Sequence, residues 1–214
     1  MEKESNQLFN TIDFEAACKA CETAQKHRLM IGLIGDTGTG KTTSVTEYAK
    51  RPNVVKVTYE KSMNPKLFFM KLLQEMRIDF EGSIYALINR AASGFNEMES
   101  PLLIVDEVGK MPYTLFLHLH DFREKTKETT GIVLAGMPYF KSNLQKYANK
   151  GKEGCSEFLR RINLWHTLEE LKRSEIQNVC QANGIQSPER FYGKRRFGDL
   201  MNAICLEKIL NQDV

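Results

Sequence analysis

The strongest chemical signal in the sequence is a glycine-rich segment, GDTGTGKT, at residues 35–42. It matches the pattern G-x-x-x-x-G-K-[ST], in which flexible glycines bring backbone N–H groups up to the phosphate oxygens of a nucleotide. The helix that follows would direct its positive N-terminal end at the same phosphates. The segment and the threonine after it are therefore predicted to contact the nucleotide: Gly35, Asp36, Thr37, Gly38, Thr39, Gly40, Lys41, Thr42 and Thr43.

Two carboxylates at the end of a later apolar run supply the partner that such a loop requires. Asp106 and Glu107 follow the run LLIV, so they should emerge at the carboxyl edge of the sheet, where ligands bind in open α/β folds. Lys41 would bind the β- and γ-phosphates, while the Thr42 hydroxyl and Asp106, the latter largely through water, would hold Mg²⁺. Glu107 would orient or deprotonate the attacking water. The alternative is an acidic pair that caps the next helix.

The elements that position these groups alternate along the chain. Apolar runs predict strands at residues 29–34, 54–59, 101–107, 131–136 and 162–166, and the segments between them predict helices. Strands that alternate with helices form a parallel sheet with helices on its faces. We therefore predict an α/β domain over residues 1–166. Residues 167–214 are predicted to form a small helical lid, whose first helix would begin at a capping box of Thr167 and Glu170.

Composition restricts the class of protein. The chain has 214 residues, 42% of them hydrophobic, and a formal net charge of +3, which permits nucleic-acid binding without requiring it. The polar N-terminus lacks a signal-peptide core, and no apolar run approaches the ~20 residues of a membrane span. Five cysteines without a framework spacing suit a reducing compartment, so we expect a cytoplasmic protein with no membrane partner. Cys18 and Cys21 have a metal-like spacing, but they fall on the apolar face of a predicted helix, which favours core packing.

Taken in order, these features resemble the AAA+ ATPases. Within that family the chain looks most similar to the transposition ATPases of the MuB, TniB and TnsC type, through the stretches PLLIVDEVGKM, GIVLAGMP and EFLRRINLWHTLEEL. The resemblance covers nearly the whole chain, residues 25–212. It implies a P-loop NTPase fold, ATP and Mg²⁺ as cofactors, and a homo-oligomer, either a ring or a helical filament, with ATP at the subunit interfaces.

The same resemblance implies roles for two arginine pairs. FLRRI resembles the stretch that supplies an arginine finger to the γ-phosphate in a neighbouring subunit, with Arg161 as the first choice and Arg160 as the second. YGKRRFGDLMNAI resembles the sensor stretch of the lid, in which either Arg195 or Arg196 would contact the nucleotide. Each pair has an alternative interpretation as solvated basic residues. Met137 stands where many AAA+ proteins carry a polar sensor, which implies slow or partner-dependent hydrolysis.

In the family that the chain resembles, DNA lies inside the assembly and is held through its backbone. The loops that would face it hold Lys61, Lys66 and Lys110, whose alternative interpretation is that of ordinary solvated lysines. The stretch before residue 29 is too short for a separate DNA-binding domain, so we expect the ATPase core itself to contact double-stranded DNA. Assembly multiplies a few phosphate contacts per subunit, which offsets the modest charge of one chain.

The resemblance therefore implies an ATPase that assembles on double-stranded DNA, marks it as a target and activates a transposase, with hydrolysis, triggered by the transposase, driving disassembly. Two other classes stay open: a helicase-loader or origin-initiator ATPase, and a signalling NTPase switch that binds a protein and no DNA. DNA binding in ATP but not in ADP would exclude the switch. An adjacent transposase gene would favour the first interpretation over the loader.

Overall fold

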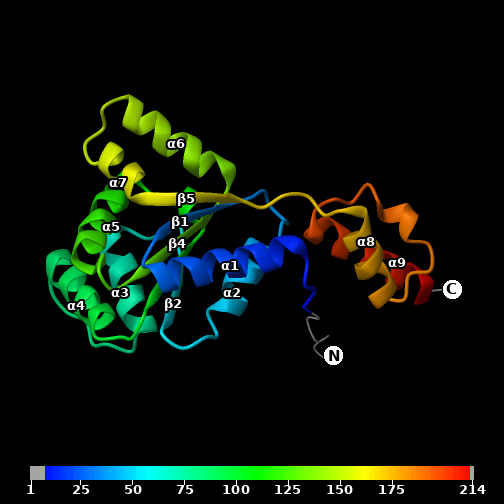
Figure 1. Cartoon of the computed structure of the whole chain (residues 1–214), viewed down its shortest axis with the longest axis horizontal. Helices are drawn as coiled ribbons and strands as arrows, with labels where there is room; N and C mark the ends of the chain where they lie inside the picture. Colours follow the sequence, from blue (N-terminus) through cyan, green and yellow to red (C-terminus); the bar gives the residue numbers. More distant parts are fainter. Residues whose placement is uncertain (1–7, 213–214) are drawn as a thin grey trace.

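The computed structural model describes residues 8–212, with side chains as far as residue 210. Within these residues, five strands form one parallel sheet in the order β2-β3-β4-β1-β5, with helices on both faces (Figure 1). A helical segment follows the last strand, and we call it the lid. The predicted parallel α/β sheet with a C-terminal helical lid is confirmed. The outer limits of the predicted domains, residues 1 and 214, lie outside the described residues, and their division after residue 166 stays a prediction.

The elements lie close to the predicted ranges. The strands are β1 Met30–Ile34, β2 Val54–Thr58, β3 Leu102–Asp106, β4 Gly131–Gly136 and β5 Ile162–Thr167. The helices of the sheet domain are α1 Ile12–His27, α2 Lys41–Tyr48, α3 Pro65–Glu75, α4 Ile84–Asn96, α5 Tyr113–Thr126, α6 Pro138–Asn149 and α7 Cys155–Arg161, with a single 3-10 turn, η1, at Val108–Lys110. The lid contains α8 Arg173–Ala182, a 3-10 turn, η2, at Pro188–Phe191, and α9 Phe197–Gln212. None of the helices between residues 8 and 212 is long and apolar enough to cross a membrane.

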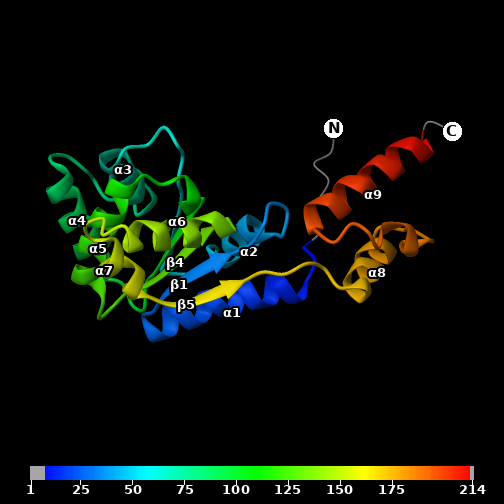
Figure 2. The same ribbon diagram turned by 90° about the horizontal axis from the view of Figure 1, so that it is seen from above.

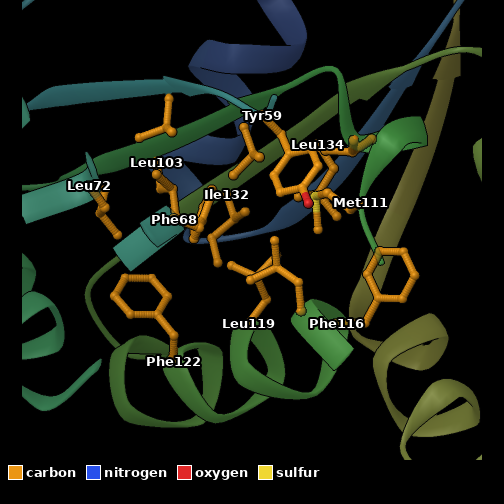
Figure 3. Packing of buried hydrophobic residues seen from close by; sticks show 14 of the residues in the cluster. Tyr59, Phe68, Leu72, Leu103, Met111, Phe116, Leu119, Phe122, Ile132 and Leu134 are labelled. Atoms are coloured by element: carbon orange, nitrogen blue, oxygen red, sulfur yellow. The ribbon is translucent and has the colours of Figure 1, made fainter. Parts of the chain in front are cut away.

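Two hydrophobic layers hold the sheet between its helices. Every residue of β1, β3 and β4 is buried, as expected of central strands in a sheet that is covered on both faces. On one face, side chains such as Phe68 of α3, Phe122 of α5 and Leu103 of β3 form the larger cluster (Figure 3). On the other face, α1 and α2 pack against the sheet, and Cys21 is buried in that layer.

Burial raises the pKa of the Cys21 thiol to about 12, so this side chain serves core packing.

The parallel arrangement brings all five carboxyl ends to one edge of the sheet. Ile34 at the end of β1 pairs with Gly136 at the end of β4, and Thr58 of β2 pairs with Asp106 of β3. The loop after β1, the acidic pair at the end of β3 and the loop after β4 therefore lie together. The lid follows β5 beyond the same edge (Figure 2).

The lid has a hydrophobic cluster of its own and is tied to the N-terminal helix. Its buried members are Leu171, Ile176, Val179, Cys180, Phe191, Leu200 and Ile204, and Phe9 packs against them. The Ile12 backbone N–H donates to Glu175 Oε1 (2.8 Å), and the Glu169 N–H donates to Asp13 Oδ1 (3.1 Å). The start of α1 is thus bonded to the lid through two carboxylates.

One local prediction was wrong. Thr167 is the last residue of β5, and the first lid helix begins only at Arg173. The carboxylate that caps this helix is Glu175, whose Oε2 accepts the N–H of Lys172 at 2.8 Å. Pairing of β5 with β1 extends to Thr167, and this ladder overrides the local capping signal. In addition, no pattern in the sequence predicts the short helix α7, which precedes β5.

Candidate nucleotide-binding site

The glycine-rich segment forms a tight loop from β1 to α2. Gly38 and Gly40 adopt positive φ angles of 82° and 88°, a conformation that costs other residues energy. Gly35 donates its N–H to Gly136 O (3.2 Å), which fixes the start of the loop to β4. Thr39 closes the turn by donating its hydroxyl to Asp36 O at 2.9 Å. The loop therefore places backbone N–H groups in front of the α2 N-terminus, an arrangement that binds anions.

Lys41 lies folded over this loop. Its Nζ donates to the carbonyl oxygens of Gly35 (2.6 Å) and Asp36 (2.7 Å). Burial lowers the pKa of the Lys41 ammonium, and the charges of Asp106 and Glu107 act in the opposite direction. The ammonium is thus held at the loop, between the backbone and the two carboxylates, where it can bind phosphate oxygens.

Asp106 fits a magnesium site. Its Oδ1 accepts the Glu107 N–H at 2.9 Å, whereas its buried Oδ2 accepts no hydrogen bond from the described part of the chain. The Lys56 ammonium lies 3.9 Å from this oxygen, too far for a hydrogen bond, and a buried carboxylate oxygen without a donor is costly unless a cation compensates it. Asp106 and Thr42 line the same cavity of about 240 Å³. Their carboxylate and hydroxyl oxygens are the ligand types that Mg²⁺ prefers.

Glu107 is held in a strained conformation next to Asp106. Its φ and ψ of 62° and 31° are left-handed, which is uncommon for a residue other than glycine and often marks a functional site. The Glu107 carboxylate forms an ion pair with Lys110 at 3.1 Å. Lys110, predicted to contact DNA, therefore lies beside the predicted catalytic carboxylate, and its contact with DNA stays a prediction.

The lid closes over the loop through the beginning of α9. The Gly198 N–H donates to Gly38 O (2.9 Å), and a Cβ at residue 198 would lie 3.1 Å from the Gly38 Cα. Arg196 Nη2 forms an ion pair with Asp36 Oδ2 at 2.8 Å. Arg195 instead pairs with Glu170 (2.8 Å). Of the two predicted lid arginines, the fold brings Arg196 to the phosphate loop.

A larger cavity, of about 570 Å³, lies beside the loop and includes residues that sequence reasoning missed. Gly40 and Thr43 line it together with four apolar side chains: Leu8, Phe9, Phe14 and Phe197. The rings of Phe9 and Phe197 lie 5.9 Å apart between centroids. Its volume suits a small-molecule ligand. These apolar residues are visible in the sequence. No periodicity, however, indicates that the segment before α1 and the start of α9 meet beside the phosphate loop.

The predicted arginine finger lies away from this cavity. Arg161 precedes β5, whose first residue pairs with Met30 at the start of β1, whereas the phosphate loop follows the other end of β1. A strand of this length spans about 16 Å. Arg161 therefore lies at the amino ends of the strands, whereas the phosphate loop lies at their carboxyl ends. It forms an ion pair with Glu124 of α5 at 2.5 Å, beside the exposed Arg160.

The remaining predicted residues lie at the carboxyl edge. Thr37 donates its hydroxyl to Met137 Sδ at 3.5 Å, so Met137, which departs from the polar sensor of many AAA+ proteins, contacts the phosphate loop through its thioether. Lys61 and Lys66 are exposed in the connection after β2 and at the start of α3. The topology places both on the same edge of the sheet as Lys110.

Comparison with known proteins identifies the family. The family described as AAA domain matches residues 24–144, a segment that includes the phosphate loop, Asp106 and Glu107. The chain belongs to this AAA family. It is 27% identical over 200 residues to the Mu-like prophage FluMu DNA transposition protein B of Haemophilus influenzae, covering 86% of this chain and 61% of that protein. The predicted resemblance to MuB-type AAA+ ATPases is thereby confirmed, although the chain spans less than two thirds of that relative's length.

Solved AAA+ structures share the fold. The Aeropyrum pernix ORC2 protein in its ADP form superposes with a TM-score of 0.68 at 12% identity, covering 94% of this chain and 64% of that chain. The replication initiator DnaA bound to AMPPCP and single-stranded DNA gives a TM-score of 0.61 at 16% identity, covering 97% of this chain and 62% of that chain. At these identities the likeness concerns the architecture alone.

Proposed function

We propose that this AAA+ chain binds ATP with Mg²⁺ between the sheet and the lid and hydrolyses it. The observation that carries the proposal is the cavity in which Lys41, Thr42, Asp106 and Glu107 meet Gly198 of the lid. Thr42 and Asp106 would hold Mg²⁺, which when bound neutralises phosphate charge. Lys41 binds phosphate oxygens, and Glu107 takes the proton of the attacking water.

The adjoining cavity supplies a place for the nucleoside. Phe9 and Phe197 offer apolar surface to a base, while Thr43 and Gly40 connect this cavity to the phosphate loop. Because Phe9 belongs to the N-terminal segment and Phe197 to the lid, a bound base would contact both. Nucleotide would therefore stabilise the arrangement of lid and sheet domain.

We further propose that ATP drives head-to-tail assembly on double-stranded DNA, and that the assembly marks target DNA and activates a transposase. The support for this finer function is the similarity to a DNA transposition protein B. The placement of Arg161 is compatible with it, because an arginine at the far edge from its own loop can act only on a neighbour's nucleotide. Such an interface joins two different surfaces and yields a ring or a filament.

Sedimentation with duplex DNA tests this proposal. The full chain with ATP should pellet with long duplex DNA, and the pelleted fraction should fall at least ~10-fold with ADP, because only ATP completes the interface. Lys41→Ala serves as the matched protein that lacks nucleotide binding. ATP binding without any DNA binding would contradict the proposal and favour a signalling switch. Equal DNA binding with ATP, with ADP and without nucleotide would contradict the ATP-driven assembly.

A further inference from the structure

A lysine that belongs to none of the motifs lies beside the proposed magnesium ligand. Lys56 Nζ is 3.9 Å from Asp106 Oδ2, the oxygen that receives no hydrogen bond from residues 8–210. The Asp106 side chain is 2% exposed and that of Lys56 is 18% exposed. The Lys56 stem is therefore largely covered, while its ammonium lies near a buried carboxylate.

The register of the sheet explains how Lys56 reaches this position. Lys56 and Thr58 point to the same face of β2, since side chains alternate along a strand. Lys56 pairs with Ile104 and Thr58 pairs with Asp106, so these four residues share one face. The Lys56 stem runs along β2, and its Nζ donates to Thr58 Oγ1 at 3.1 Å. This hydrogen bond holds the ammonium at the level of the Asp106 carboxylate.

Lys41, the lysine of the phosphate loop, forms its hydrogen bonds elsewhere. Lys41 directs its Nζ to the carbonyl oxygens of Gly35 and Asp36, and the ammonium needed for phosphate binding is therefore on the loop side of the cavity. Lys56 approaches the carboxylate from β2, an edge strand of the sheet. Asp106 is thus placed between two lysines, of which only Lys41 belongs to the phosphate-loop motif.

We propose that Lys56 competes with Mg²⁺ for Asp106: its ammonium compensates the buried charge of Asp106 before the metal binds, and it lowers the affinity of the same carboxylate for Mg²⁺. A metal ion held by Asp106, directly or through water, would lie near the Lys56 ammonium, and like charges repel at such short distances. Lys56 therefore stabilises the metal-free protein and raises the Mg²⁺ concentration needed for saturation. This role rests on the proposed nucleotide site.

Lys56→Gln removes the charge and keeps a hydrogen-bond donor for Thr58. We expect the Mg²⁺ concentration that half-saturates binding of a fluorescent ADP analogue to fall about 10-fold relative to the wild-type chain. In EDTA the unfolding temperature of the variant should fall, and the rise on adding Mg²⁺ and ADP should be larger than that of the wild type. Lys56→Arg keeps the charge and should stay within about twofold of the wild-type Mg²⁺ requirement. Lys71→Gln, an exposed lysine paired with Glu75 on α3, is the matched control and should change neither measurement.

An unchanged Mg²⁺ requirement in Lys56→Gln would overturn the role of Lys56 and leave the proposed function intact. A wild-type chain that binds no nucleotide in any Mg²⁺ concentration would instead remove the proposed function and this inference with it. If Lys56→Gln is unfolded in EDTA, the inference requires that Mg²⁺ and ADP restore its folding. A variant that stays unfolded with both ligands contradicts it.

Discussion

At the scale of single residues, the proposed roles of Lys41 in ATP binding and of Glu107 in hydrolysis can be tested separately. Lys41→Ala should raise the dissociation constant for ATP about 100-fold, because it removes charge-assisted hydrogen bonds to two phosphates. Isothermal titration with ATP and Mg²⁺ measures this change. Lys19→Ala, which removes an exposed lysine paired with Glu22 on α1, is the control. Affinity retained in Lys41→Ala would mean that the glycine-rich loop does not bind phosphates.

Glu107→Gln should keep ATP binding and reduce hydrolysis about 100-fold or more, since an amide cannot accept the proton of the attacking water. The variant should therefore accumulate ATP-bound assemblies on DNA, measured as bound nucleotide after sedimentation. The ion pair with Lys110 makes Lys110→Gln a useful comparison, because it leaves the carboxylate in place. Normal turnover in Glu107→Gln would remove Glu107 from the reaction.

At the scale of elements, close packing between α1 and the start of β4 sets the angle of the helix on the sheet. A Cβ at Gly131 would lie 2.2 Å from the carbonyl oxygen of Ala24 near the end of α1. Arg123 reinforces this junction by donating to Thr130 O and Arg28 O, both at 2.6 Å. Gly131 therefore cannot gain a side chain unless α1 moves.

Gly131→Ala should lower the free energy of unfolding by roughly 1–3 kcal/mol, the usual cost of forcing an extra methyl into a packed interface. Denaturant titration of the variant and the wild type measures the difference. Gly193→Ala is the matched control, because a Cβ at Gly193 meets no atom of the described residues within 4 Å. Equal losses in both variants would show that the α1–β4 contact is not the cause.

At the scale of the whole molecule, the active site is expected to need two chains. Arg161→Ala should leave ATP binding by the monomer unchanged and lower hydrolysis by the assembly about 10³-fold, as for arginine fingers. Mixing Arg161→Ala with Glu107→Gln tests whether the arginine acts between subunits. Each variant is inactive alone, yet a mixed interface combines the Glu107 of one chain with the Arg161 of the other, so activity should return. A mixture as inactive as its components would contradict action between subunits.

The sequence alone predicted the phosphate loop and most of the order of elements. The phosphate loop needs a few residue types at fixed spacing, and buried parallel strands leave continuous apolar runs, so both were predictable from local signals. The start of the first lid helix was not predictable in this way, because the pairing of β5 with β1 extends to Thr167 and overrides the local capping signal.

Only the tertiary structure decided which distant residues meet the loop. It brought Arg196 rather than Arg195 to Asp36, joined Phe9 to Phe197 beside the nucleotide site, and placed Lys56 at the Asp106 carboxylate. These contacts depend on strand register and on how the lid packs, which are properties of residues far apart in the chain. A local pattern carries no information on them, since it records only the spacing of neighbours.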